Sequence, residues 1–156
     1  IPTESGIKLW DKLLENGVTP CGLGCRDTLR LEAGMHLYGS EMDTTTTPYE
    51  ASLGWIVNAQ KPYIGKSILE EQKKNGIDKK LVAITLTKRN IARHDYPVVD
   101  GDEIIGKVTS GTWSPSLSIP IALAYVPTKL SKVGSKIYVK IRGKLEQATI
   151  VKKPFY

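Results

Sequence analysis

The sequence has 156 residues, of which 40% are hydrophobic and 24% are charged, proportions typical of a globular protein. No apolar run approaches the ~20 residues that a membrane-spanning helix needs, since the longest candidate, Ile119 to Val126, is short and contains Pro120. The formal net charge of +6 is uneven, because residues 1–78 hold 8 basic and 11 acidic side chains whereas residues 79–156 hold 14 basic and 5 acidic ones. This shift predicts two units, and it leaves open whether the basic unit binds a polyanion or simply has a solvated lysine-rich surface.

The first unit, residues 1–78, is predicted to contain three helices and one strand. The first helix begins after Ser5 and ends before Gly17, because hydrophobic residues recur between them at helical spacing. The second helix is expected at 26–33 and the third at 66–74. Residues 53–57 are apolar and are expected to form a strand. A lone strand leaves its backbone groups unpaired and an exposed apolar helix face seeks another surface, so this unit is expected to be part of a larger α/β domain.

The second unit, residues 79–156, shows the alternation that is typical of β-strands. The large apolar residues Val82, Ile84 and Leu86 alternate with smaller or polar ones. Asp100-Gly101 lies between two short apolar runs and predicts a hairpin. Further strands are expected at 107–110, 118–126, 136–141 and 147–151. Strands without intervening helices predict a small antiparallel β-barrel or jelly roll, and the fold class of the whole chain is therefore α+β.

Cysteine and histidine residues are too few to predict a disulfide framework or a metal site. A structural zinc ion needs four ligands, and only His36 and His94 could join Cys21 and Cys25. We expect free thiols in a reducing compartment and no bound metal. Both histidines stand in polar surroundings, which favours solvated or structural roles over catalysis.

The segment from Gly22 to Gly34 is the strongest local signal for ligand binding. Its glycines allow the backbone to turn tightly or to approach a ligand. Arg26 is expected at the start of a helix, where free N–H groups and the helix dipole favour an anion, and its guanidinium can bind a carboxylate or a carbonyl-rich heterocycle. The alternative, equally open on these grounds, is that Arg26, Asp27 and Arg30 are ion-paired helix residues.

Residues 20–34, followed by 37–39 and 41–43, resemble the signature region of the glycine cleavage T-protein family. The resemblance continues along the chain in the same order. The further matching segments are 47–50, 53–55, 64–66, 81–83, 106–111, 114–117 and 121–124.

This resemblance implies a three-domain aminomethyltransferase that holds tetrahydrofolate in a central pocket. The enzyme takes an aminomethyl group from a lipoyl sulfur on an acidic carrier protein and yields ammonia, 5,10-methylenetetrahydrofolate and the reduced lipoyl arm. Residues 1–78 would be the end of the folate-binding α/β domain and residues 79–156 the C-terminal barrel. The resemblance also implies that the catalytic aspartate lies in an N-terminal half outside this chain. We therefore expect no catalytic residue here and no activity from the chain alone.

Arg26 matches a folate contact of the family by motif and is the principal candidate for folate binding. Arg93 is a second candidate for contact with folate or the carrier protein, with the alternative that it pins two strands together. The resemblance implies a cytoplasmic protein, or one of the mitochondrial matrix in a eukaryote, without a nucleic-acid or membrane partner.

Three other functions stay open. A folate-binding non-transferase relative could act in iron–sulfur maintenance or RNA modification, although the Lys-Gly-Cys-Tyr type signature of such relatives is absent from this sequence. A folate domain could be fused to a flavin-dependent demethylating oxidase. A basic β-barrel could bind nucleic acid, but its aromatic residues are scattered rather than interleaved with the basic ones.

Overall fold

The computed structural model describes all 156 residues and contains three α-helices followed by six β-strands. The helices are α1 (Gly6–Glu15), α2 (Leu23–Glu32) and α3 (Lys66–Asn75), with short 3-10 helices η1 (Thr3–Ser5), η2 (Gly54–Ile56) and η3 (Thr128–Leu130). The strands are β1 (Lys79–Leu86), β2 (Pro97–Asp100), β3 (Glu103–Ser114), β4 (Ile119–Pro127), β5 (Lys136–Ile141) and β6 (Lys144–Val151). None of the helices combines the length and the apolar character needed to cross a membrane.

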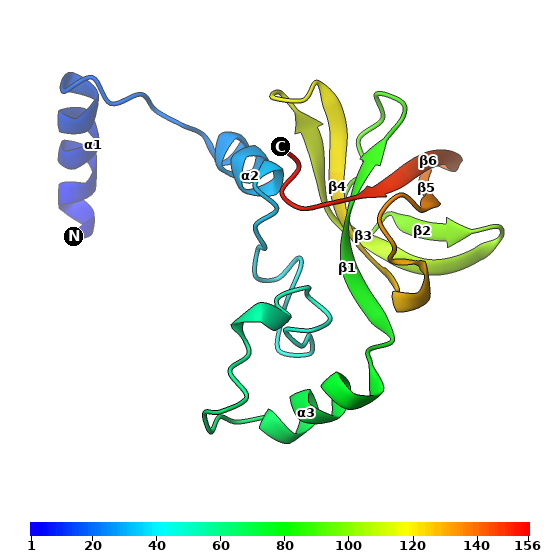
Figure 1. The fold of residues 1–156 in the computed structure, drawn as a ribbon. Helices are drawn as coiled ribbons and strands as arrows, with labels where there is room; N and C mark the ends of the chain where they lie inside the picture. Colours follow the sequence, from blue (N-terminus) through cyan, green and yellow to red (C-terminus); the bar gives the residue numbers. More distant parts are fainter.

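The six strands close into a single antiparallel barrel, which confirms the predicted α+β class with a C-terminal barrel (Figure 1). The strand order is β1–β4–β3–β2–β5–β6, and pairing of β1 with β6 closes it. Closure gives every strand two neighbours, so no edge is left to pair with another chain. Each hairpin turn contains at least one residue with a positive φ. Between β5 and β6, for example, Arg142 and Gly143 have φ of 49° and 82°.

The barrel interior is filled by side chains from alternate strand positions. Val82, Ile84 and Leu86 of β1 point into this interior as the alternation predicts, and they are buried. The outer face of β1 is buried as well, because Leu81 and Ala83 belong to a second cluster that includes Leu31 of α2. The helix α2 therefore covers one side of the barrel and is fixed to it by apolar contact.

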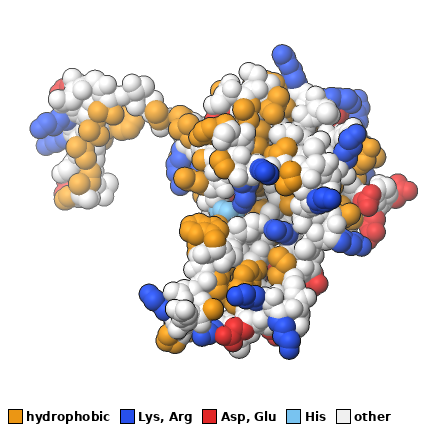
Figure 2. Space-filling model, viewed as in Figure 1, with side chains coloured by type: hydrophobic (Ala, Val, Ile, Leu, Met, Phe, Trp, Pro, Cys, Tyr) orange, Lys and Arg blue, Asp and Glu red, His pale blue; other side chains and the backbone are white.

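The helix α1 stands away from the barrel at the end of an extended segment (Figure 1). Its hydrophobic residues Ile7, Trp10, Leu13 and Leu14 are all exposed, and none of its residues is buried. Figure 2 shows hydrophobic side chains along one side of α1. This amphipathic helix thus presents an apolar face that nothing in the chain covers.

Some sequence expectations were wrong in detail. No strand forms at residues 53–57. They contain the 3-10 helix η2 (Gly54–Ile56), because Leu53 donates its N–H to Pro48 O at 2.7 Å and the chain turns without a neighbouring strand. The second helix begins at Leu23 rather than at residue 26, since the extended Gly22 serves as its N-cap. The strand expected at 107–110 is the middle of the longer β3.

Candidate functional site

The helix α2 and the strands it covers form the candidate site. Leu31, near its C-terminal end, is fully buried against residues of β1 and β4. Polar contacts then fix the helix in one orientation. Several of them join α2 to residues far along the chain.

Glu32 ties the end of α2 to the turn after β3. Its carboxylate accepts hydrogen bonds from the Ser114 hydroxyl, from the Ser116 N–H at 3.2 Å and from the Ser116 hydroxyl at 2.8 Å. Its carbonyl oxygen accepts the N–H of Phe155 at 3.1 Å. The hydrogen bond from Ser114 is the principal cause that lowers the pKa of Glu32, with a smaller opposing effect of burial. Glu32 is therefore an ionised, buried anchor.

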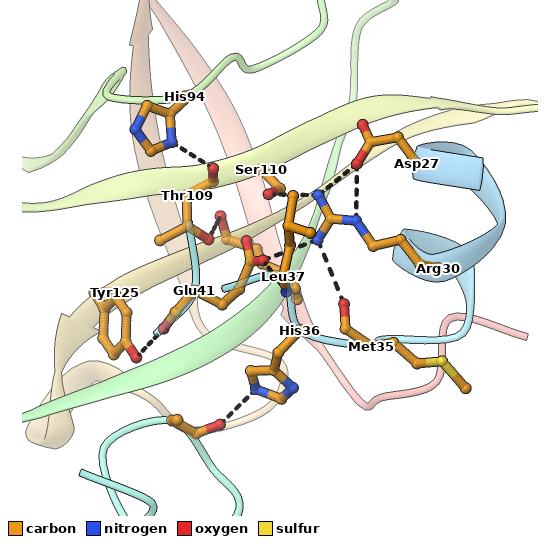
Figure 3. Close-up of polar contacts among 12 residues, drawn as sticks. Asp27, Arg30, Met35, His36, Leu37, Glu41, His94, Thr109, Ser110 and Tyr125 are labelled. Carbon is orange, nitrogen blue, oxygen red and sulfur yellow. Dashed lines mark hydrogen bonds and ion pairs between the residues drawn. The ribbon is translucent and has the colours of Figure 1, made fainter. Parts of the chain in front are cut away.

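Arg30 is the centre of a second network, drawn in Figure 3. Its Nε and Nη2 donate to Asp27 Oδ1 at 2.8 and 2.6 Å, and its Nη1 donates to Glu41 Oε2 at 2.9 Å. Nη2 also donates to Ser110 Oγ of β3 at 2.8 Å. The alternative that these α2 residues are ion-paired thus holds for Asp27 and Arg30.

Glu41 lies on the segment after α2 and is fully buried. Its Oε2 accepts the N–H of Leu37 as well as the Arg30 guanidinium, and its carbonyl oxygen accepts the Tyr125 hydroxyl at 2.7 Å. Burial is the main cause that raises the pKa of Tyr125, so its hydroxyl keeps the proton that it donates. Glu41 Oε1 has no hydrogen-bond partner. Burial lowers the pKa of Lys153, and the charge of Glu41 partly offsets this effect.

Arg26 has different surroundings from Arg30, one turn further along the helix. Its side chain is exposed and forms no hydrogen bond or ion pair within the chain. It is the fourth residue of α2 rather than the first, because the helix begins at Leu23. Arg26 borders an open hollow of about 420 Å³ whose wall includes Leu29, Ala33 and Met35. Such a hollow, apolar with guanidinium groups at its rim, suits part of a small organic anion.

A second hollow of about 650 Å³ adjoins the first and shares Ala33 and Met35 with it. His36 and Lys153 border it. Burial is the first cause that lowers the pKa of His36, and its Nε2 lies 2.7 Å from Ala51 O. His36 is therefore neutral at neutral pH. Its Nε2–H donates to the Ala51 carbonyl, which is a structural role.

Arg93 lies on the loop between β1 and β2 and is exposed, without a hydrogen bond or ion pair from its side chain. The neighbouring His94 holds the loop on β3 through Nδ1, 2.6 Å from Thr109 O (Figure 3). The loop lies so close to β3 that a Cβ at Gly111 would come within 1.9 Å of Ala92 O. The loop and α2 thus contact adjacent residues of β3, since Arg30 binds Ser110, but no bond joins Arg93 to Arg26.

The sequence analysis did not identify Glu32, Glu41 or Ser110 as residues of this site. No group of three or more His, Cys, Asp or Glu residues is placed to hold a metal ion.

Comparison with protein-family models gives two matches. The model described as "Glycine cleavage T-protein C-terminal barrel domain" matches residues 79–156, and "GCVT N-terminal domain" matches residues 1–61. Together they account for the barrel and for the segment that carries α1 and α2.

Curated relatives and a solved structure agree with these matches. An aminomethyltransferase of Parasynechococcus marenigrum (strain WH8102) is 58% identical over 97% of this chain, and one of Synechococcus sp. (strain CC9311) is 55% identical over 100% of it. The chain spans 42% and 43% of the length of these two relatives. The crystal structure of glycine cleavage system aminomethyltransferase T from Bartonella henselae superposes with a TM-score of 0.91 at 31% identity, over 100% of this chain and 45% of that one.

Proposed function

The chain belongs to the glycine cleavage T-protein, or aminomethyltransferase, family, and from this premise we propose that it serves a tetrahydrofolate-dependent aminomethyl transfer. In this reaction the aminomethyl carbon passes from a lipoyl sulfur on a carrier protein to tetrahydrofolate, and ammonia is released. Residues 1–78 supply one wall of the folate pocket, and residues 79–156 supply the barrel that supports this wall.

The observation that carries the proposal is the free guanidinium of Arg26 beside an apolar hollow. An arginine without an internal partner can give its full set of donors to a ligand, and its planar fork matches a carboxylate or the carbonyl and ring nitrogens of a pterin. The apolar wall of Leu29, Ala33 and Met35 fits the flat face of a heterocycle. We assign Arg26 to folate binding, and Arg93 remains a weaker candidate.

The anchors of α2 support this role because a binding group must be held in place before the ligand arrives. Arg30 and Glu32 fix the helix to β3 and to the turn after it. Arg26 lies within two turns of both anchors, so its Cα position is set by the barrel. Its side chain alone remains to be ordered when folate binds.

The charge of the barrel supports an acidic partner. Residues 79–156 carry 14 basic and 5 acidic side chains. A field of this sign attracts the anionic glutamate tail of a folate and an acidic lipoyl carrier protein, and it would raise their association rates at low ionic strength. We propose both as the partners.

In our proposal, the carboxylate that stabilises the cation developing on the aminomethyl carbon is not a residue of this chain. The two relatives are more than twice as long as the chain, and the family resemblance assigns the catalytic aspartate to the N-terminal half. The non-transferase alternative receives no support from the comparisons, because the relatives and the structure described above are all named aminomethyltransferases.

A chimera tests the proposal. The corresponding residues of the Parasynechococcus enzyme are replaced by this chain, which the 58% identity makes feasible. We expect the chimera to form 5,10-methylenetetrahydrofolate from an aminomethyl-loaded carrier protein, and the 156-residue chain alone to form none. A folded chimera that binds folate without transfer would contradict the proposal, and so would turnover by the chain alone.

Variants of the chimera test the role of Arg26. Loss of hydrogen bonds to a charged group costs about 1.5–3 kcal/mol, so Arg26→Ala should raise the KM for tetrahydrofolate by about 10- to 150-fold. Arg26→Lys should recover only part of this loss, since a lysine lacks the planar fork. The matched control is Lys74→Ala, an exposed cation on α3. Equal KM values for tetrahydrofolate in Arg26→Ala and Lys74→Ala would show that Arg26 does not bind folate.

A further inference from the structure

Two thiols share the rim of the hollow that Arg26 borders. Cys21 lies two residues before α2 and Cys25 is the third residue of this helix. Both side chains are exposed and both line the same hollow. The proposed folate role of Arg26 makes no use of either thiol.

The two thiols flank the N-cap of α2. Gly22, the N-cap of α2, is extended with φ −73° and ψ 168°, and the Cys25 N–H donates to Gly22 O at 3.0 Å. This is the first turn of a helix after an extended N-cap, and the residues on either side of it, Cys21 and Cys25, both line the same hollow. Interaction with Cys21 raises the pKa of Cys25, which is the effect of a neighbouring thiol. The Cys21 thiol itself donates to Thr19 O at 3.8 Å.

We propose that Cys21 and Cys25 form a dithiol site that reacts with a small-molecule disulfide, such as oxidised glutathione, and closes to an intramolecular disulfide. Three observations carry this inference: both thiols are exposed, both line one hollow, and this open hollow leaves room for an approaching reagent. The proposal does not rest on the aminomethyl transfer described above.

The reaction consists of two thiol–disulfide exchanges. The thiolate of Cys21 attacks one sulfur of the oxidant, and one glutathione leaves as thiolate while a mixed disulfide forms on Cys21. Cys25 then loses its proton and attacks the Cys21 sulfur, which releases the second glutathione. Two cysteine thiols are thereby oxidised by two electrons, and one glutathione disulfide is reduced to two thiols.

The new bond would tie the segment before α2 to the first turn of the helix. The anchors Arg30 and Glu32 lie in the later turns, so the disulfide can form without disturbing them. It would remove two polar hydrogens from the rim of the hollow and restrict the approach to Arg26.

Mass spectrometry after equilibration in glutathione redox buffers tests this proposal on the 156-residue chain. Acid quenching and alkylation of the remaining thiols follow. We expect the oxidised chain to lose two hydrogens, to carry no glutathione and to accept no alkylating reagent, and dithiothreitol should reverse these changes. The variants Cys21→Ser and Cys25→Ser should each stop at a mixed disulfide with one glutathione, because neither has a second thiol.

The same titration in denaturant measures what the fold contributes. If the helix start holds the thiols together, the effective concentration of one thiol at the other should be at least about tenfold higher in the folded chain than in the unfolded one. An equal value in both states would overturn the proposal. Three other results for the wild-type chain would also overturn it: two bound glutathiones, disulfide-linked dimers, or no reaction.

Discussion

Two arginines of α2, one helical turn apart, differ in what they contact. Arg30 donates to Asp27, to Glu41 and to Ser110, so its donors are used within the chain. Glu41 is fully buried, and an ion pair at such a position is costly to break because the remaining charge would be left without a partner. Arg26 has no comparable contact. The Arg30 guanidinium is therefore structural, and the Arg26 guanidinium is available to a ligand.

Glu32 offers a stability prediction. In Glu32→Gln the charge that Ser114 and Ser116 contact is lost while the size of the side chain is kept. We expect the free energy of unfolding at pH 7 to fall by about 1–3 kcal/mol, since hydrogen bonds to a charged acceptor are worth more than neutral ones. Urea unfolding of the wild type and the variant measures this difference.

The effect of Glu32 also depends on pH. Its pKa is lowered in the folded chain from the ordinary value of 4.5, so the unfolded chain binds more protons as the pH falls. The stabilisation by Glu32 is therefore fully present above pH 4.5 and is lost as the pH falls through the folded pKa. The difference in free energy of unfolding between wild type and Glu32→Gln should therefore shrink as the pH falls below 4.5. Glu71→Gln on the exposed side of α3 is the control and should match the wild type at every pH; a constant difference for Glu32→Gln would contradict the assignment.

At the scale of elements, the contact between the β1–β2 loop and β3 gives a further prediction. A Cβ at Gly111 would lie 1.9 Å from Ala92 O, and a backbone carbonyl cannot move without its loop. Gly111→Ala should therefore displace residues 91–93 and reduce the free energy of unfolding by about 1–3 kcal/mol. Thermal unfolding measures the loss, and changed NMR shifts at Arg93 would report the displaced loop.

The control for Gly111→Ala is Gly6→Ala. Gly6 starts α1 with φ −61° and has no atom within 4 Å of a built Cβ, so alanine should be tolerated or slightly stabilising. If Gly111→Ala were equally harmless, the close packing of the loop on β3 would be wrong.

The elements that the sequence predicted well depend on local chemistry. The hairpin at Asp100-Gly101 and the alternation of β1 follow from turn geometry and from a period of two residues. Residues 53–57 have the composition of a strand but no neighbouring strand to pair with, and this requires knowledge of the tertiary fold. The start of α2 was misplaced because the glycine N-cap at residue 22 gives a weaker signal than a serine or aspartate.

The candidate site was predictable only where a motif marked it. Arg26 followed from its glycine-flanked segment and from the family resemblance, and its folate role stays a prediction. Glu32 and Glu41 could not be distinguished from surface carboxylates, because their burial results from contacts with residues such as Ser114 and Tyr125 that are more than 80 positions away. A pattern within one helix contains no information about such partners.

At the scale of the whole molecule, the two halves of the chain are packed very differently. The barrel has a cluster of 14 buried hydrophobic residues inside it, and α2 adds Leu31 to a second cluster on its outer face. The helices α1 and α3 contain no buried residue. Figure 2 shows the consequence, a rounded body with α1 projecting from it. The uncovered apolar face of α1 is the kind of surface that marks an interaction site.

Hydrogen–deuterium exchange would test this difference along the chain. An isolated helix of ten residues is marginal in water, so the amides of α1 should be protected by less than about tenfold relative to an unstructured peptide. Amides of β1, β3 and β4 can exchange only when the barrel opens, and their protection should exceed about a thousandfold. The helix α2 should lie between them, because Leu31 and Glu32 hold it on the barrel. In the chimera with the Parasynechococcus enzyme, α1 should gain protection while the barrel changes little. Strong protection of α1 in the 156-residue chain alone would mean that a second copy or another surface already covers its apolar face.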